Sequence, residues 1–282
     1  MERDLTQLLD AICSSSSYRL AEEDLAFLAR PELRPVRLQL EALKPEMIQQ
    51  EHGIHSTIVV FGSTRIGPAD AARRRLAQAE EALSREPENL DRQRDVRVAR
   101  SLLEKSRNYD AARRFAQIVS GSCQVQGRRE FVVVTGGGPG IMEGANRGAF
   151  DVGAKSIGLN ITLPHEQRPN PYITPELCFL FHYFAMRKMH FLLKAKALVA
   201  FPGGFGTLDE LFETLTLIQT GKSPRVPVIL FGRGYWERII NWTALVEEGV
   251  IDPGDLGLFE FAESPEEAWE RICAFYGLES RR

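Results

Sequence analysis

The chain has 282 residues, of which 44% are hydrophobic and 26% are charged, a composition typical of globular proteins and unlike disordered or fibrous chains. Its 35 basic and 38 acidic side chains leave a net charge of −3, so no global positive field favours nucleic acid as a partner. The 4 cysteines form no C-x-x-C motif and the 5 histidines complete no zinc spacing, which argues against a disulfide framework or a metal site. The N-terminal sequence predicts neither a signal peptide nor a membrane span, and we expect a soluble cytoplasmic protein.

Residues 1–56 are expected to form an N-terminal helical extension. Apolar side chains recur at helical spacing from Leu5 to Ile12, and a second short helix is expected at Leu25–Leu28. The pattern changes at Thr57, where a short apolar run ending at Phe61 predicts a buried strand.

Residues 69–107 are rich in Arg, Glu and Ala, and they predict two charged helices hinged near Pro87. The run Arg73–Arg75 could be interpreted as a patch that binds nucleic acid. Acidic residues are interspersed through the whole segment, however, and this mixture favours a solvated helical hairpin inserted after the first strand.

After the hairpin, strand-like runs alternate with amphipathic helical stretches. Strands that are apolar throughout and separated by helices are typical of a parallel sheet covered on both faces. The sequence therefore predicts an α/β fold over residues 57–282, a Rossmann-like parallel sheet with helices on both faces. The expected later strands are Phe131–Thr135, Ser156–Ile161, Ala197–Phe201 and Val226–Phe231.

Two of these strands run into glycine-rich turns that open helices. One turn is Gly136-Gly137-Gly138-Pro139-Gly140, with Pro139 expected in the first helical turn, and the other is Pro202-Gly203-Gly204-Phe205-Gly206-Thr207. Such turns leave backbone N–H groups free at the positive end of a helix, where a phosphate can bind. Tight packing turns are the alternative interpretation.

Two common nucleotide-binding motifs do not fit the chain. A dinucleotide-binding fingerprint requires a third glycine at the position of Ile141, and an acidic residue near Asn160 that is absent. Gly221-Lys222-Ser223 resembles the end of a P-loop, but Thr216 stands where its first glycine should be, so Gly221 is better explained as a helix C-cap.

The sequence PGGFGTLDE, with GGGPGIMEGANRGAF upstream and Arg187-Lys188 between them, resembles the Lonely Guy (LOG) family over about residues 57–252. These proteins were formerly labelled lysine decarboxylases. The residue run Phe184-Ala185-Met186 replaces the Met-His-x of short plant-type members, so the chain is more similar to the longer bacterial branch.

The resemblance implies a nucleoside 5′-monophosphate phosphoribohydrolase that releases a free base and ribose 5-phosphate, without a metal or cofactor, as a homodimer or larger homo-oligomer. AMP and cytokinin riboside 5′-monophosphates are the expected substrates. Carried over residue by residue, the family's catalytic pair falls on Arg187 and Glu210. The expected substrate- and phosphate-binding residues are Gly62, Ser63, Gly136, Gly137, Gly138, Gly140, Lys188, Gly203, Gly204, Gly206 and Thr207.

Each catalytic candidate also has a structural interpretation. Thr207 and Glu210 read as T-x-x-E, a capping box in which each side chain bonds the other residue's backbone N–H. Glu213 could be a surface acid or a second carboxylate of the site. Arg187 could be an ordinary ion-pair residue, or its fork of donors could reach phosphate, ribose or Glu210.

Several other residues are weaker candidates. The aromatic run His182–Phe184 could stack on a base or belong to the core. Glu143 and Asn146 follow the first glycine turn and could touch a ligand or pack, and Pro164–Gln167 could form a lid.

Two function classes remain open from the sequence. Cleavage of a ribosyl C–N bond builds positive charge on the sugar, which a carboxylate such as Glu210 can stabilise while it orients water. The alternative is a non-catalytic nucleotide-binding sensor or carrier on the same fold. A decarboxylase is disfavoured, because no lysine has a setting that suggests a Schiff base with pyridoxal phosphate.

Overall fold

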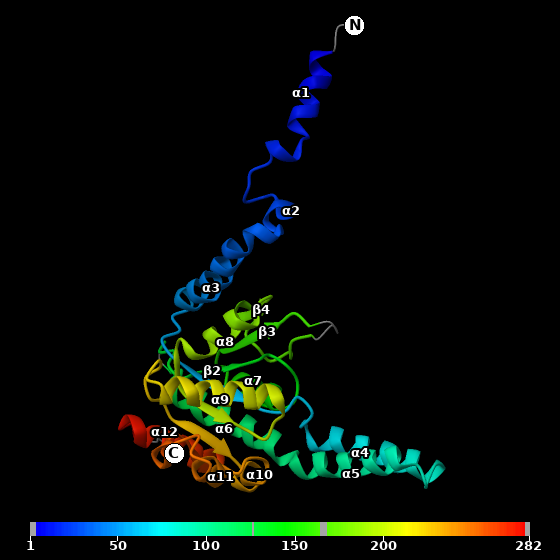
Figure 1. Ribbon diagram of the computed structural model, residues 1–282, viewed down its shortest axis with the longest axis vertical. Coiled ribbons are helices and arrows are strands. Elements are labelled where there is room, and N and C mark those ends of the chain that lie inside the picture. Colours follow the sequence, from blue (N-terminus) through cyan, green and yellow to red (C-terminus); the bar gives the residue numbers. More distant parts are fainter. Residues whose placement is uncertain (1–3, 126, 164–167, 280–282) are drawn as a thin grey trace. The chain divides into compact units, whose positions relative to one another are not determined.

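A computed structural model describes residues 4–125, 127–163 and 168–279 (Figure 1). The described chain divides between Glu46 and Met47 into two compact units. The first unit holds α1 (Leu5–Cys13), α2 (Leu25–Leu28) and most of α3 (Arg34–Glu51), a helix of 18 residues that continues into the second unit. Helix α1 is capped by the Asp4 carboxylate, which accepts a hydrogen bond from the Thr6 N–H, and neither α1 nor α2 contains a buried residue.

The second unit is built around a parallel sheet of 7 strands in the order β4-β3-β2-β1-β5-β6-β7. Its α/β architecture agrees with the expected fold class. The strands are β1 (Thr57–Phe61), β2 (Val132–Thr135), β3 (Ser156–Ile161), β4 (Cys178–Phe181), β5 (Ala195–Ala200), β6 (Val228–Phe231) and β7 (Glu260–Ala262).

Helices cover both faces of this sheet. They are α6 (Arg107–Cys123), α7 (Ile141–Asp151) and α12 (Pro265–Tyr276) on one face, and α8 (Phe184–Leu192), α9 (Phe205–Gln219), α10 (Arg233–Ile239) and α11 (Trp242–Glu247) on the other. Short 3-10 turns are found at Ser16–Tyr18, Pro31–Leu33, Pro175–Leu177 and Pro253–Leu258.

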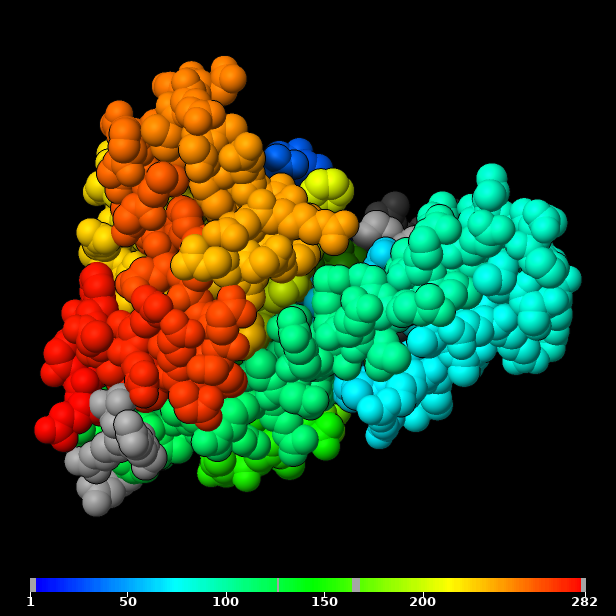
Figure 2. Space-filling view, turned by 90° about the horizontal axis from the view of Figure 1, so that it is seen from below, coloured from blue at the N-terminus to red at the C-terminus, as the bar shows by residue number. Residues whose placement is uncertain are grey.

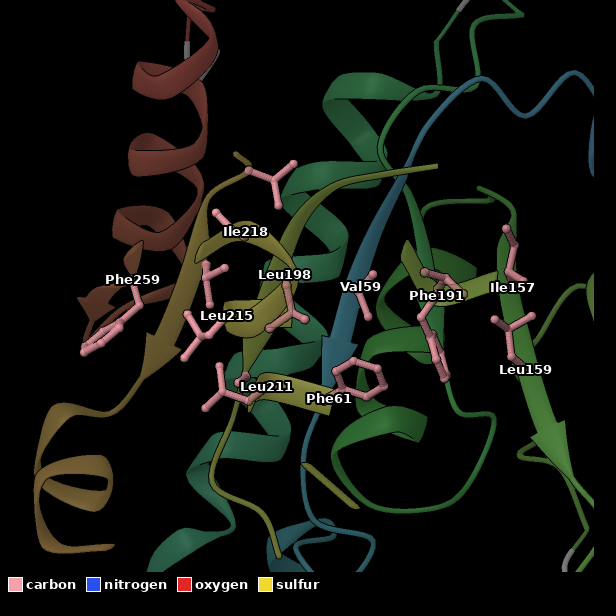
Figure 3. Packing of buried hydrophobic residues seen from close by; sticks show 14 of the residues in the cluster. Val59, Phe61, Ile157, Leu159, Phe191, Leu198, Leu211, Leu215, Ile218 and Phe259 are labelled. Atoms are coloured by element: carbon pink, nitrogen blue, oxygen red, sulfur yellow. The ribbon is translucent and has the colours of Figure 1, made fainter. Parts of the chain in front are cut away.

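Alternation along the strands produces the two cores. In β1, Val59 and Phe61 face the α8–α9 layer with Leu198 of β5, while Ile58 and Val60 face the α6–α7 layer (Figure 3). All 5 residues of β1 are buried, because a central parallel strand has helices on both sides. The continuous apolar run in the sequence follows from this position.

The inserted segment forms two helices, α4 (Ala69–Arg85) and α5 (Leu90–Lys105), which project from the sheet (Figure 1). The chain breaks between them around Pro87, and the Asn89 side chain caps α5 by accepting hydrogen bonds from the N–H groups of Asp91 and Arg92. Exposed ion pairs such as Arg100–Glu80 join the two helices. The helical hairpin is therefore present as the sequence predicts.

Candidate functional site

The centre of the sheet contains the point where the strand order reverses. From β1 the chain moves outward through β2, β3 and β4, and it then returns to place β5 on the other side of β1. In such sheets a crevice for ligands opens beyond the carboxyl ends of the two strands that flank the reversal. The Phe201 N–H donates to the Phe61 carbonyl at 2.9 Å and the Ser63 N–H donates to the Pro202 carbonyl at 3.0 Å, so the two turns lie side by side.

A cavity of about 520 Å³ opens at this crevice. Seven sequence-predicted site residues line it, namely Gly62, Ser63, Arg187, Gly204, Gly206, Thr207 and Glu210. The sheet topology thus brings together residues that are up to 148 positions apart in the chain, from Gly62 to Glu210.

The second glycine turn leads directly into α9, which begins at Phe205 with Gly204 as its N-cap and no capping side chain. The N–H groups of Thr207 and Leu208 both donate to the Gly204 carbonyl at 3.0 Å. The N–H groups of Phe205 and Gly206, which precede them in the first turn, have no acceptor within the helix and form the positive end of its dipole. This end of the cavity can therefore bind an anion.

The capping-box interpretation of Thr207 and Glu210 is wrong. Because α9 begins at Phe205, Thr207 is already the third residue of the helix and Glu210 the sixth. The Glu210 side chain is therefore not needed to complete the end of the helix. The expected helical position of Pro139 is also wrong, since Gly140 is the N-cap of α7 and Pro139 precedes it.

Glu210 is the buried acid of the cavity, with 5% of the residue exposed. Burial raises its pKa to about 7 from an ordinary value of 4.5; the positive charge of Arg187 opposes the rise and the negative charge of Glu213 adds to it. Near neutral pH this carboxyl group can therefore gain or lose a proton, as acid–base catalysis requires.

Arg187 is held by contacts on two sides. Its Nε donates to the Leu159 carbonyl at 2.7 Å, and its guanidinium carbon lies 5.0 Å from the centre of the Phe191 ring. Burial lowers the pKa of Arg187, while the Glu210 carboxylate favours its charged form. The fold thus fixes a cation in the wall of the cavity that also contains the buried acid.

The first glycine turn leaves room for the Arg187 side chain and packs against the turn of β1. A Cβ atom at Gly136 would lie 2.6 Å from Nη2 of Arg187, so only glycine lets the guanidinium approach the backbone this closely. Gly140 has φ +72°, and a Cβ atom there would strike the Ser63 carbonyl oxygen. The carbonyls of Gly137 and Gly138 both accept hydrogen bonds from the buried Asn170 side chain.

Two other predicted residues lie beside the cavity. Lys188 forms ion pairs with Asp209 at 2.9 Å and with Glu213 at 3.1 Å, which places it between α8 and α9. Gly203 lies against Thr207, because a Cβ atom on Gly203 would meet the Thr207 hydroxyl.

The weaker candidates separate clearly. Phe184 lines the cavity, whereas the rings of His182 and Tyr183 pack against each other with centres 4.6 Å apart. Asn146 is fully buried, where its carbonyl oxygen accepts a hydrogen bond from the Thr135 hydroxyl at 2.7 Å.

Glu143 accepts a hydrogen bond from the Tyr109 hydroxyl at 2.9 Å. The proposed lid Pro164–Gln167 lies outside the described residues.

Sequence reasoning missed several residues of the cavity wall, among them Arg65, Met142 and Phe205. Arg65 adds an exposed cation two positions after Ser63, whose hydroxyl accepts a hydrogen bond from the Arg65 N–H at 3.1 Å. Its place directly after the turn of β1 was the available signal. Within the described ranges, no group of three or more His, Cys, Asp and Glu side chains could hold a metal, and no helix is long and apolar enough to cross a membrane.

Comparisons with known proteins give a consistent relationship. Residues 142–272 match a family described as "Possible lysine decarboxylase". The chain is 28% identical over 148 residues to a probable cytokinin riboside 5′-monophosphate phosphoribohydrolase of Oryza sativa subsp. japonica, a match covering 51% of this chain and 58% of that protein. It is 30% identical over 145 residues to a cytokinin riboside 5′-monophosphate phosphoribohydrolase of Arabidopsis thaliana, covering 50% of this chain and 66% of the other.

Among solved structures, a molybdenum cofactor binding protein from Rippkaea orientalis superposes with a TM-score of 0.43 at 21% identity, covering 60% of this chain and 88% of that one.

Proposed function

We propose, from the premise that this chain belongs to the LOG (lysine-decarboxylase-like) family, that it hydrolyses the N-glycosidic bond of a nucleoside 5′-monophosphate. The products would be the free base and ribose 5-phosphate. The observation that carries the proposal is the position of Glu210, a buried carboxyl group one to two helical turns from the N-terminus of α9 in the same cavity.

The 5′-phosphate would bind at the start of α9, where Gly204, Gly206 and Thr207 line the cavity. Arg65 and Arg187 add positive charge at its sides. Binding of the phosphate fixes the ribose relative to the catalytic groups, so part of the binding energy lowers the barrier of the reaction.

Glu210 would act on the ribose itself. As the C1′–N bond breaks, its electron pair passes to the base and positive charge builds on the sugar, which the carboxylate stabilises. The oxygen of a water molecule then bonds to C1′. Glu210 would orient that water and accept its proton. The proton then passes to the departing base, which took the C1′–N electron pair, and the carboxylate is restored.

The residues do not suit an amino-acid decarboxylase that depends on pyridoxal phosphate. That chemistry requires a lysine to form a Schiff base with the cofactor. Among the described residues the cations of the cavity wall are Arg65 and Arg187, and Lys188 is engaged by Asp209 and Glu213.

The base would lie near Met142 and Phe184, which supply an apolar wall to the same cavity. These two side chains offer contact area without hydrogen-bond readout, so we propose that adenine and modified adenines are both accepted. AMP and cytokinin riboside 5′-monophosphates are therefore the substrates to compare first.

We also propose that the chain forms a homodimer or a larger homo-oligomer. Phe205 is 92% exposed and lies with Leu208 and Phe212 along one side of α9, an apolar surface that a second copy could cover. Light scattering on the protein as it elutes from a size-exclusion column measures the mass of the assembly directly.

Comparison of AMP with adenosine tests the proposed function. If the start of α9 binds the phosphate, adenosine loses several charge-assisted hydrogen bonds, each worth roughly 1.5–3 kcal/mol. We therefore expect kcat/KM for adenosine to be lower by at least about 10²-fold, with a loss in kcat as well as in KM. Equal rates on both substrates would contradict phosphate binding at this turn.

A further inference from the structure

A second cavity, of about 410 Å³, lies on the other side of the glycine turn of β5. It is lined by Ile66, Pro202 and Tyr235, and by residues of α5 in the inserted hairpin. Figure 2 shows this hairpin, coloured cyan to green, projecting beside the orange segment that contains α10. The insert therefore contributes a wall to a hollow next to the proposed active site.

The wall contributed by α5 is positively charged. Arg94, Arg97 and Lys105 all line the cavity, and their spacing of three and eight residues places them on one face of the helix with Ser101. No carboxylate lines this cavity among the residues that the structure describes. An anion entering it would thus meet three cations.

Neighbouring acids compete only weakly with an incoming anion for these cations. Arg94 lies 3.4 Å from Asp91, but both side chains are more than 60% exposed, so solvent screens the pair. Lys105 donates to the Ser101 hydroxyl at 2.5 Å. A bound phosphoryl group could engage all of these donors without breaking a buried ion pair.

The second cavity adjoins the first. Ser63 and Gly204 line both, so an anion at the start of α9 lies at the boundary between them. The Tyr235 hydroxyl donates to the Gly203 carbonyl at 2.5 Å and holds the turn that separates the two spaces. A ligand bound through its 5′-phosphate can therefore extend further phosphates towards α5.

We propose that the cationic face of α5 is a binding subsite for the phosphates beyond the first in a nucleoside 5′-diphosphate or 5′-triphosphate. The inference rests on the proposed function in one respect, since it takes the first phosphate to lie at the start of α9. The subsite makes the insert a determinant of which nucleotides the site accepts.

The rest of the hairpin argues against nucleic acid as the ligand. Elsewhere on α4 and α5 several arginines are paired with acids, as in Arg73–Asp70, Arg85–Glu81 and Arg100–Glu80. A long polyanion would meet these mixed charges. The face that lines the cavity gathers three cations and, among the residues that the structure describes, no carboxylate, which suits a short polyphosphate.

The test measures binding of AMP and ADP by titration calorimetry without added Mg²⁺, in a Glu210→Gln background that keeps the nucleotides intact. We expect ADP to bind about tenfold more tightly than AMP, the effect of one charge-assisted hydrogen bond partly screened by solvent. A triple variant, Arg94→Gln, Arg97→Gln and Lys105→Gln, should bring the two affinities together.

A matched triple variant provides the control. Arg73→Gln, Arg85→Gln and Arg100→Gln removes the same number of positive charges from the same hairpin, at side chains that are 60–73% exposed. This control should keep the preference for ADP. Equal affinity for AMP and ADP in the parent protein, or the same preference in both triple variants, would overturn the subsite.

Hydrolysis of AMP by the unmodified protein is measured separately. If AMP yields no free base and the α5 variant still loses a preference for ADP, the proposed function fails while the subsite stands. If AMP is hydrolysed and the preference does not depend on α5, the subsite fails alone.

Discussion

Glu210 is an acid that α9 and its neighbours keep largely out of water, and its replacement by glutamine separates chemistry from structure. Glutamine has nearly the same size and needs no counter-charge, so Glu210→Gln should fold with an unchanged or higher melting temperature. Turnover of AMP should fall by about 10²-fold or more, because the carboxylate is lost. Steady-state assays and thermal melts measure the two effects.

Glu213→Gln is the control for this substitution. Glu213 lies one turn along α9, where it pairs with Lys188. Its variant should retain most of the turnover. Full activity per folded molecule in Glu210→Gln would mean that the buried carboxyl group has no part in the reaction.

The pH dependence of the reaction follows from the same residue. Since burial raises the pKa of Glu210 to about 7, kcat/KM should increase as the pH rises through about 7 and the carboxylate forms. The folded protein binds this proton more tightly than the unfolded chain does. The contribution of Glu210 to stability therefore decreases as the pH rises from about 4.5 to about 7.

Glu210→Gln should lose this limb of the pH–rate profile while keeping any titration of the substrate phosphate. In the unmodified protein, a kcat/KM that stays level from pH 5.5 to 8, a window chosen to bracket the expected midpoint of about 7, would contradict the assignment of this limb to Glu210.

The substitution Gly136→Ala tests whether activity requires Arg187 to lie this close to the backbone. A methyl group at this position would meet Nη2 of Arg187 at 2.6 Å and Sδ of Met142 at 2.9 Å, and both side chains must then move. A displacement of about 1 Å in a positioning group can lower the rate by about 10²-fold. We expect Gly136→Ala to lower kcat strongly with a small change in melting temperature.

Gly121→Ala is the matched control, because a Cβ atom at this exposed position in α6 has nothing within 4 Å. Its activity should be unchanged, and its stability should rise by up to about 1 kcal/mol. Equal activities of the two alanine variants would show that Arg187 tolerates the displacement.

At the scale of elements, α8 and α9 share a row of charges that tunes the pKa of Glu210. The charge of Glu213 raises this pKa and that of Lys188 lowers it. Glu213→Gln should therefore shift the midpoint of the pH–rate profile to lower pH, and Lys188→Gln should shift it to higher pH. Shifts in the same direction would mean that these charges do not act through Glu210.

The sequence locates both glycine turns correctly between strands and helices but misplaces where the helices begin. A T-x-x-E pattern favours a cap at Thr207, yet α9 begins earlier, at Phe205. Gly204 is the N-cap, and the Gly203 backbone approaches the Thr207 side chain too closely for any other residue at position 203. The T-x-x-E pattern does not include these two glycines.

The inserted hairpin illustrates a second limit. Its composition correctly predicts two solvated helices, because acids and bases alternate along it. Composition averages over all faces of a helix, so it does not reveal that Arg94, Arg97 and Lys105 share the face towards the glycine turn of β5. Which face of a helix meets another element depends on the fold, so this cluster could not be identified from the sequence.

At the scale of the whole molecule, the apolar runs predict a parallel sheet, and five of its strands can be identified in the sequence. The short edge strands β4 and β7 were not among them, because an edge strand is paired on one side and does not need a long apolar run. The strand order also lies beyond local patterns. It is the order that places the turns after β1 and β5 side by side.

The site therefore depends on topology as much as on motifs. Arg187 and Glu210 could be selected by their resemblance to a known family, but the buried setting that raises the pKa of Glu210 follows from packing. Arg65 follows the turn of β1 and Met142 follows the first glycine turn, but the sequence does not show that their side chains meet, because only the cavity brings them together.

The most direct test of the central claim is the product balance after incubation of the purified chain with AMP. We expect free adenine and ribose 5-phosphate in equal amounts, accumulating with time and nearly absent with Glu210→Gln. Saturable binding of AMP with no release of adenine would contradict it, and it would make this cavity a nucleotide-binding site without catalysis.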